Sequence, residues 1–127
     1  MAPEFALTEE SLDEDRHVIA IAGEIDLFTA PEMKATLIGA IDAGKTRIVV
    51  DLSKTTFLDS TALGVLIGAI KRLRARDGAL TIVNTEPTIA KTFEITGLDQ
   101  IFTITETRDQ AIAALDADPQ KIGRAHV

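Results

Sequence analysis

The chain has 127 residues, of which 46% are hydrophobic and 26% are charged, and its formal net charge is −7. This length and balance predict one globular domain with a substantial core. The absence of cysteine excludes disulfides, thiol catalysis and zinc–thiolate sites. The acidic charge argues against nucleic-acid binding through phosphate neutralisation. Because no apolar run reaches the ~18–20 residues that a membrane span needs, we expect a cytoplasmic protein that binds neither nucleic acid nor membrane.

The first half of the chain predicts two paired strands, a helix and a buried strand. Val18 and Ile19 favour the pleated backbone of the second strand, which is expected to form a hairpin with the first. Pro31 suits the first turn of the helix, and Gly44 follows its last apolar residues. The predicted bounds are residues 1–9 and 17–22 for the hairpin, a helix from Thr29 or Ala30 to Gly44, and a strand at residues 47–52.

The second half alternates helices and strands, which predicts parallel strands joined by right-handed crossovers. The predicted bounds are a helix from Ser60 to Ala75, a strand at 79–84, a helix from Glu86 to Gly97, a strand at 101–104 and a helix at 107–115. With the antiparallel hairpin in front, the sheet is expected to be mixed. We assign residues 1–117 to one domain and residues 118–127 to a polar tail, whose last residues resemble a cloning remnant.

The helix predicted to begin near Ser60 has two unlike faces. An apolar face, expected to contact the core, consists of Leu63, Leu66, Ile67, Ile70 and Leu73. The opposite face carries small and polar residues, namely Thr61, Gly64, Val65, Gly68, Ala69 and Arg72. Because small residues let another backbone approach closely, this outer face and Ser60 together form a candidate docking surface for a partner.

Asp59 and Ser60 stand where this helix begins. Both are good N-cap residues, because a side-chain oxygen can accept a free amide hydrogen of the first turn. The Ser60 hydroxyl is therefore expected at the surface, in the role of a cap. A phosphate on this oxygen would lie at the positive end of the helix, where an anion is tolerated. Phosphorylation could then change what docks without unfolding the helix, and Thr61 offers a second hydroxyl.

Enzymatic chemistry has little support in the sequence. A nucleophilic Ser60 would lack the G-x-S-x-G elbow, and its base would have to be His17, in a predicted strand, or His126, in the tail. Asp51 lies near the end of a strand, where α/β proteins often place functional groups, and one such group is the phospho-acceptor aspartate of a receiver domain. Glu24 and Asp26 fit poorly the acidic pair that a receiver requires, so we interpret Asp51 as a turn residue.

The remaining polar residues have ordinary structural interpretations. Asp26 and Thr29 are expected in a loop or a helix cap before the first helix. A basic cluster late in the second helix complements its negative end, and an acidic patch on a partner is the alternative. The cluster consists of Lys71, Arg72, Arg74 and Arg76. The sequence contains no metal-ligand spacing and no phosphate-cradling glycine loop.

Four segments together carry a family resemblance: residues 23–26 with 29–30, 48–53, 57–66 and 93–98. They are similar to the G-E-L/I-D…T-A segment, the central strand, the F-M/L-D-S-S/T-G-L-G-V-L signature and the F-x-x-x-G-L element of the STAS domain family, in particular of bacterial anti-sigma factor antagonists. The resemblance covers roughly Phe5 to Leu115. It implies an α/β fold with a mixed four- to five-stranded sheet and helices mainly on one face. Ala62 stands where many members have glycine, which is expected to stiffen the first turn without loss of function.

The resemblance also implies a function, in which Ser60 is the phosphorylated residue. The unphosphorylated protein would bind an anti-sigma factor Ser/Thr kinase, which uses its own ATP and Mg²⁺, and would release the sigma factor. The phosphorylated protein would dissociate, and a PP2C-type phosphatase would reset it. The expected partner-binding residues are Asp26, Thr29, Asp59, Thr61, Gly64, Val65, Gly68 and Arg72.

A protein of this kind is expected to be a monomer and no enzyme, with no cofactor and no metal of its own. The alternative is a STAS subunit that does not switch, within a transport or signalling assembly. In that case Ser60 would serve only as a cap.

Overall fold

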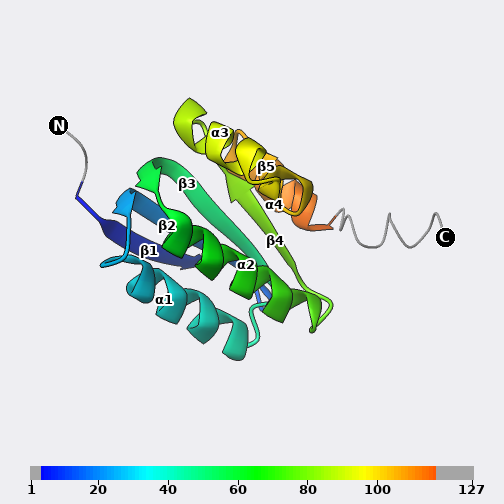
Figure 1. Ribbon diagram of the computed structural model, residues 1–127. Coiled ribbons are helices and arrows are strands. Elements are labelled where there is room, and N and C mark those ends of the chain that lie inside the picture. Colours follow the sequence, from blue (N-terminus) through cyan, green and yellow to red (C-terminus); the bar gives the residue numbers. More distant parts are fainter. Residues whose placement is uncertain (1–3, 117–127) are drawn as a thin grey trace.

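A computed structural model of the chain describes residues 4–116 as an α/β domain built on a five-stranded sheet (Figure 1). The strands are β1 (Ala6–Ser11), β2 (Arg16–Ile25), β3 (Arg47–Leu58), β4 (Ala79–Val83) and β5 (Thr103–Thr105). The helices are α1 (Ala30–Asp42), α2 (Ser60–Arg74), α3 (Pro87–Ile95), the short 3-10 helix η1 (Leu98–Gln100) and α4 (Arg108–Asp116). The tail predicted at 118–127 and the start of the first predicted strand lie outside the described residues. Within residues 4–116, no helix has both the length and the apolar character that crossing a membrane requires.

The sheet has the mixed topology that the alternation of elements predicts. The strand order is β1-β2-β3-β4-β5, with β1 antiparallel to β2 and the other neighbours parallel. Each crossover connection leads to the next strand on the same side, and such connections are right-handed. The three crossover helices, α1, α2 and α3, therefore lie on the same face of the sheet. Helix α4 follows the last strand and covers the opposite face, where Ala111 and Leu115 pack against Val18 and Val49. The expectation of helices mainly on one face is confirmed.

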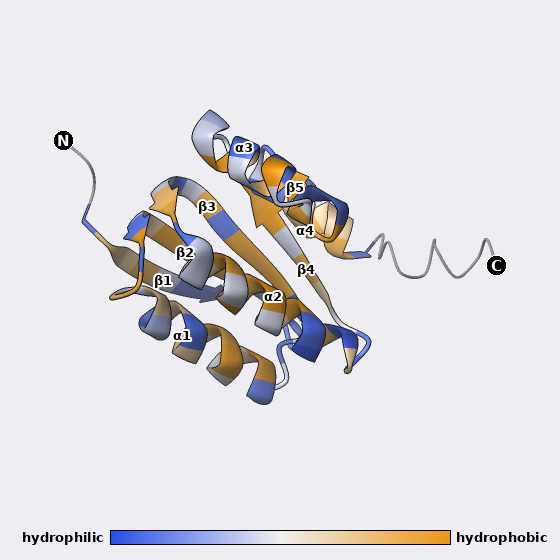
Figure 2. Ribbon diagram, in the orientation of Figure 1, coloured by the Kyte–Doolittle hydropathy of each residue, from blue (hydrophilic) through white to orange (hydrophobic). Residues whose placement is uncertain are grey.

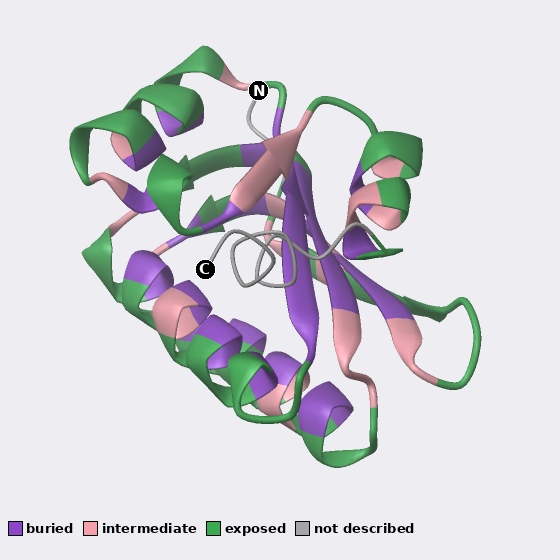
Figure 3. Cartoon of the chain, turned by 90° about the vertical axis from the view of Figure 1, so that its right-hand side faces the viewer, coloured by how far each residue is buried: buried purple, intermediate pink, exposed green. Residues whose placement is uncertain are grey.

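The larger core lies between the sheet and the first three helices. In Figure 3 the central strands are buried along most of their length, whereas the helices expose one side. Val50 and Leu52 of β3 and Leu66 of α2 are fully buried there, and burying a side chain of this size stabilises the fold by about 1.5–3 kcal/mol. Phe93 and Phe102 close one end of this core with an edge-to-face contact, their ring centroids 6.1 Å apart.

Strand β3 is longer than the sequence pattern predicts, because it continues beyond Leu52 to Leu58. Its polar second half resembles a loop in sequence, yet it pairs with the end of β2 across two register shifts. Thr55 is buried within it and donates a hydrogen bond to the carbonyl of Ile21 at 2.7 Å. The extension carries the chain directly into α2, so that the residue before this helix is fixed by the sheet. Ile95, the last residue of α3, is 73% exposed although its side chain is apolar.

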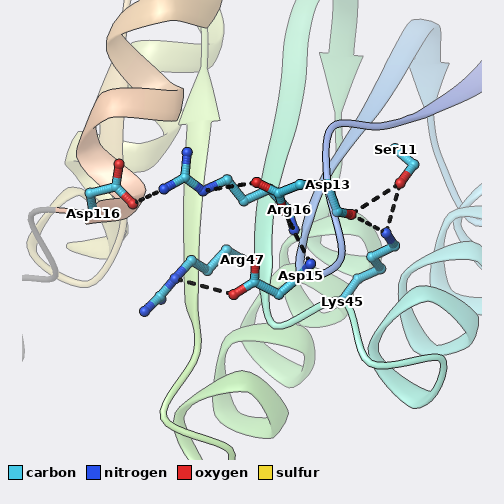
Figure 4. A network of polar contacts seen from close by, with 7 residues as sticks. All are labelled: Ser11, Asp13, Asp15, Arg16, Lys45, Arg47 and Asp116. Carbon is cyan, nitrogen blue, oxygen red and sulfur yellow. Dashed lines mark hydrogen bonds and ion pairs between the residues drawn. The ribbon is translucent and has the colours of Figure 1, made fainter.

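A network of polar contacts ties the amino ends of β2 and β3 together (Figure 4). The Lys45 ammonium donates to the hydroxyl of Ser11 at 2.7 Å and to the carbonyl of Asp13 at 2.5 Å. The Arg16 guanidinium pairs with Asp116 at the end of α4. Together these contacts hold the turn between β1 and β2 against α4 and the residues that lead into β3.

An ion pair between Asp51 and Arg108 fastens α4 to the sheet. The Arg108 guanidinium donates to Asp51 at 2.8 Å, and the amide of Ser53 donates to the other carboxylate oxygen at 2.9 Å. Burial raises the pKa of Asp51, but these hydrogen bonds and the arginine charge outweigh burial and hold the pKa below its usual value. Asp51 is therefore a buried structural carboxylate inside β3, and its interpretation as a turn residue is wrong.

Replacing Asp51 by asparagine is expected to lower the free energy of unfolding at pH 7 by about 1–3 kcal/mol. The ion pair with Arg108 is lost, and the hydrogen bond from the Ser53 amide becomes a weaker, neutral one. Since the folded-state pKa is lowered, the carboxylate stabilises the fold above the unfolded value of about 3.9 and this contribution is lost as the pH falls through the folded-state pKa. Urea unfolding at pH 7, 5 and 3 should show the difference shrinking below about pH 4. Asp109→Asn, at an exposed position on α4, is the matched control. An equal difference at all three pH values would contradict this account.

Candidate functional site

The start of α2 is built by Asp59, whose side chain caps the helix. Asp59 has an extended backbone, and its carboxylate accepts from the amides of Thr61 at 2.9 Å and Ala62 at 3.1 Å. The prediction that Ser60 caps the helix is therefore wrong, because the cap lies one residue earlier. Ser60 is the first helical residue and is exposed, and the hydrogen bonds within residues 4–116 include none from its hydroxyl. The cap is complete without Ser60, which leaves its hydroxyl available.

The turn before α1 is held together by its own side chains. The Asp26 carboxylate accepts from the amides of Phe28 at 2.9 Å and Thr29 at 3.1 Å. The Thr29 hydroxyl accepts from the Asp26 amide at 2.8 Å and donates to the carbonyl of Glu24 at 3.0 Å. The hydrogen bonds from Phe28 and Thr29 lower the pKa of Asp26 below its usual value. Thr29 occupies the N-cap position, but its side chain stabilises the turn and makes no capping bond.

The two helix starts lie next to each other at the carboxyl edge of the sheet. Ile25 and Leu58 are partners at the ends of the parallel strands β2 and β3, and the amide of Asp59 donates to the carbonyl of Ile25 at 3.1 Å. This pairing brings Asp26 to the same region of the surface as Asp59 and Ser60, although at least 33 positions separate it from them in sequence. The helices α1 and α2 then run side by side from this region across the same face of the sheet (Figure 1).

Three exposed apolar side chains border this region, and sequence reasoning missed them. Leu27 is 63% exposed, Phe28 86% and Phe57 47%. They belong to the turn before α1 and to the end of β3, where Figure 2 shows apolar ribbon. We call these three residues the apolar rim. The only sequence signal was a pair of apolar residues, Leu27 and Phe28, between the polar residues Asp26 and Thr29.

A groove of about 590 Å³ lies between α1 and α2. Its α2 side is the outer face predicted from the sequence, and its α1 side supplies both apolar residues and a lysine. The lining residues are Ala30, Pro31, Lys34, Leu37, Ile38, Thr61, Gly64, Val65, Gly68, Ala69 and Arg72. Ala69 was expected on the exposed face but is only 3% exposed, because it lies next to the buried stripe of α2 and forms part of the groove floor.

The basic cluster of α2 divides into two kinds of residue. Arg76 donates to the carbonyl of Ile41 at 2.6 Å, and Arg74 donates to the carbonyl of Ile101 at 3.4 Å, so both hold neighbouring segments. Arg72 instead lines the groove. Arg74 and Arg76 therefore have a structural role, whereas Arg72 is exposed at the groove.

The arrangement gives no support to a hydrolase or a metal site. His17 bonds to Glu9 through Nε2 at 2.9 Å, near the amino end of β2. From His17 to the end of β2 at Ile25, an extended strand spans roughly 25 Å. Ser60 lies beyond this carboxyl end of the sheet, so His17 is too far away to act as its base. His126 lies outside the described residues. Within residues 4–116, no three His, Asp or Glu side chains are grouped so as to hold a metal ion.

Comparisons with known proteins agree with this architecture. A family model described as "STAS domain" matches residues 10–111. An anti-sigma-B factor antagonist of Listeria monocytogenes is 42% identical over 94 residues, which are 72% of this chain and 81% of that protein. The crystal structure of an anti-sigma factor antagonist from Mycobacterium paratuberculosis has a TM-score of 0.81 at 26% identity, covering 89% of this chain and 95% of the other.

The structure of the Bacillus cell fate determinant SpoIIAA in its phosphorylated form is also similar. Its TM-score is 0.69 at 26% identity, and the match covers 86% of this chain and 98% of that one. The fold, the position of the helices and the family model all lead to the same assignment, and the chain belongs to the STAS domain family.

Proposed function

We propose that this protein is an anti-sigma factor antagonist controlled by phosphorylation of Ser60. In its unphosphorylated form it binds an anti-sigma factor Ser/Thr kinase and causes that protein to release its sigma factor. Phosphorylation ends the binding, and a PP2C-type phosphatase restores the active form. The protein acts as a monomeric binding module, and the chemistry of phosphate transfer belongs to its partners.

The observation that carries this proposal is the exposed hydroxyl of Ser60 at a helix start whose cap is already complete. Asp59 satisfies the amides of Thr61 and Ala62, so a phosphate on Ser60 would not displace the cap. The phosphate would also lie at the positive end of α2, where an anion is favourable. The fold can therefore accept the modification, and its effect falls on whatever docks at this surface.

The charges around Ser60 explain why a partner would dissociate. Asp59 and Asp26 already place two carboxylates in this region, and a phosphate adds a charge of about −1.5 to −2. A partner that fits the unmodified surface would have to desolvate this new charge or approach it with unfavourable contacts. Since about 1.4 kcal/mol weakens binding tenfold, a few such interactions are sufficient to separate the two proteins.

The names of the relatives support the same proposal. The Listeria protein is named as an antagonist of an anti-sigma factor, and the structure of SpoIIAA was determined in a phosphorylated form. In this chain Asp26, Thr29, Asp59 and Thr61 would shape the contact surface around Ser60. The positions Gly64, Val65, Gly68 and Arg72 would extend that surface along α2.

Incubation with the cognate anti-sigma factor kinase and ATP is expected to add one phosphate to the protein, which mass spectrometry should map to Ser60. Ser60→Ala should take up none, and Thr61→Ala, the matched control, should still take up one phosphate. Phosphate on Thr61 alone would overturn the assignment of the acceptor. If the kinase forms no complex and transfers no phosphate, the switching function is wrong and a STAS subunit that does not switch becomes the better description.

A further inference from the structure

We propose that the groove between α1 and α2 receives an acidic amphipathic helix of the anti-sigma factor. The inference rests on the proposed function and specifies how the partner is held. The docked helix would bury apolar residues along the groove and place carboxylates beside Lys34 and Arg72. Contact would therefore extend from Ser60 along the helices and would not be limited to the phosphorylation site.

The shape of the groove suits a helix. The stretch from Thr61 to Arg72 rises about 16 Å along α2, which is about three helical turns. Ala30, Leu37 and Ala69 form a buried floor, and Ile38 and Val65 are half-buried on the two sides. A partner helix with apolar residues at positions i, i+3, i+4 and i+7 presents a stripe that fills a groove of this kind.

Two glycines open the α2 side of the groove. A Cβ added at Gly64 or Gly68 would meet no atom within 4 Å, so packing inside the domain does not require glycine at either position. Glycine is nevertheless a poor residue for the interior of a helix, because it loses the most backbone entropy on folding. The two positions lie one turn apart on the same face, where the absence of side chains lets a second backbone approach α2 closely.

The charge of the groove selects for acidic residues. Lys34 and Arg72 are exposed at the groove, and none of its lining residues is acidic. This contrasts with a chain whose net charge is −7. The net negative charge of the protein attracts a basic helix at long range, but Lys34 and Arg72 would repel it once it entered the groove. An acidic helix would find complementary charges at that position.

The position of the groove connects it to phosphorylation of Ser60. Thr61 lines the groove and directly follows Ser60, so a phosphate would stand at the groove's end. Asp26 and Asp59 already make that end acidic. An acidic partner helix in the groove would lie close to the phosphate on Ser60. Repulsion between the two negative charges would therefore act directly on the docked helix.

Binding of the purified anti-sigma factor, measured by calorimetry at two salt concentrations, tests the charge. The double variant Lys34→Glu/Arg72→Glu is expected to bind about tenfold more weakly or worse at low salt. The matched control Lys71→Glu/Lys91→Glu makes the same change of charge at exposed positions outside the groove and should bind within about threefold of the wild type. Equal binding by both double variants would overturn the charge argument.

A second pair of variants tests the shape. Gly68→Leu places a side chain in the groove and should weaken binding about tenfold or more, while the thermal midpoint stays the same or rises. Gly39→Leu is the matched control, because Gly39 is exposed on α1, also has open space at its Cβ and does not line the groove. Its binding should be unchanged.

Photo-crosslinking identifies the occupant. With p-benzoylphenylalanine in place of Ile38, the crosslink should map to an acidic helical segment of the anti-sigma factor. A crosslink to a basic or non-helical segment, or a dimer of this chain that Gly68→Leu dissociates, would overturn the proposal. If the wild type does not bind the anti-sigma factor at all, the proposed function fails. If the wild type binds and the groove variants bind equally well, the function stands and the groove proposal alone is wrong.

Discussion

Replacing Ser60 by aspartate is expected to weaken binding of the anti-sigma factor at least about 100-fold, whereas Ser60→Ala should leave the affinity within about threefold of the wild type. The two variants differ in charge and hydrogen bonding. Neither is expected to disturb core packing or the helix cap, because Ser60 is exposed and Asp59 caps α2. A difference between them therefore reports on the interface.

The physical reason is the cost of desolvating a third negative charge next to Asp59 and Asp26. A carboxylate left without a partner in a closed interface costs several kcal/mol, and every 1.4 kcal/mol weakens binding about tenfold. The same carboxylate is favourable for the isolated domain, because it lies at the positive end of α2. Loss of binding and retained or increased stability are thus expected together.

Calorimetry with the purified kinase, paired with thermal unfolding of each variant, separates these effects. Thr61→Asp is a useful control, because it places the same charge one residue further along, at a position that lines the groove. We expect it to weaken binding as well, but it should still accept phosphate at Ser60. An affinity of Ser60→Asp equal to that of the wild type would remove the basis of the switch.

The order of elements and the sheet topology could be predicted because they depend on local patterns. Apolar periodicity marks α2, the β-branched run marks the first half of β3, and the alternation of helices and strands fixes parallel pairing. The same periodicity identified Gly64, Val65, Gly68 and Arg72 as one outward face, which the structure finds along a single groove. Motif spacing then placed Asp59 and Ser60 at the start of α2.

Features that depend on distant residues were not accessible in this way. The second half of β3 has no apolar alternation and becomes a strand only because it pairs with β2, as the bond from Thr55 to Ile21 illustrates. Arg108 reaches Asp51 across 57 residues of sequence, and no local pattern joins them. The choice between Asp59 and Ser60 as the cap depends on backbone angles at a single residue, which composition does not determine.

The exposed residues of the apolar rim were missed for a different reason. Hydrophobic residues in a sequence are ordinarily assigned to the core, and a single exposed one carries no meaning by itself. Phe28 gains significance only when the structure shows it 86% exposed on a turn fixed by Asp26 and Thr29, beside Ser60. The hydrogen bonds of this turn hold the ring outward before any partner arrives, so little order has to be gained on binding.

Phe28→Ala is accordingly expected to weaken binding of the anti-sigma factor by about 2–4 kcal/mol, or about 30- to 1,000-fold, because buried aromatic residues dominate interface energies. The effect should fall mainly on the dissociation rate, which surface plasmon resonance measures directly. Stability should change by no more than about 0.5 kcal/mol, because the ring contributes little to the core of the free domain.

Ile95→Ala is the matched control, since Ile95 is 73% exposed at the far end of α3 and is expected to have no influence on the complex. If both variants bind like the wild type, the apolar rim does not take part in the interface. If Phe28→Ala alone dissociates faster, the turn before α1 supplies much of the binding energy, and phosphorylation of Ser60 controls dissociation.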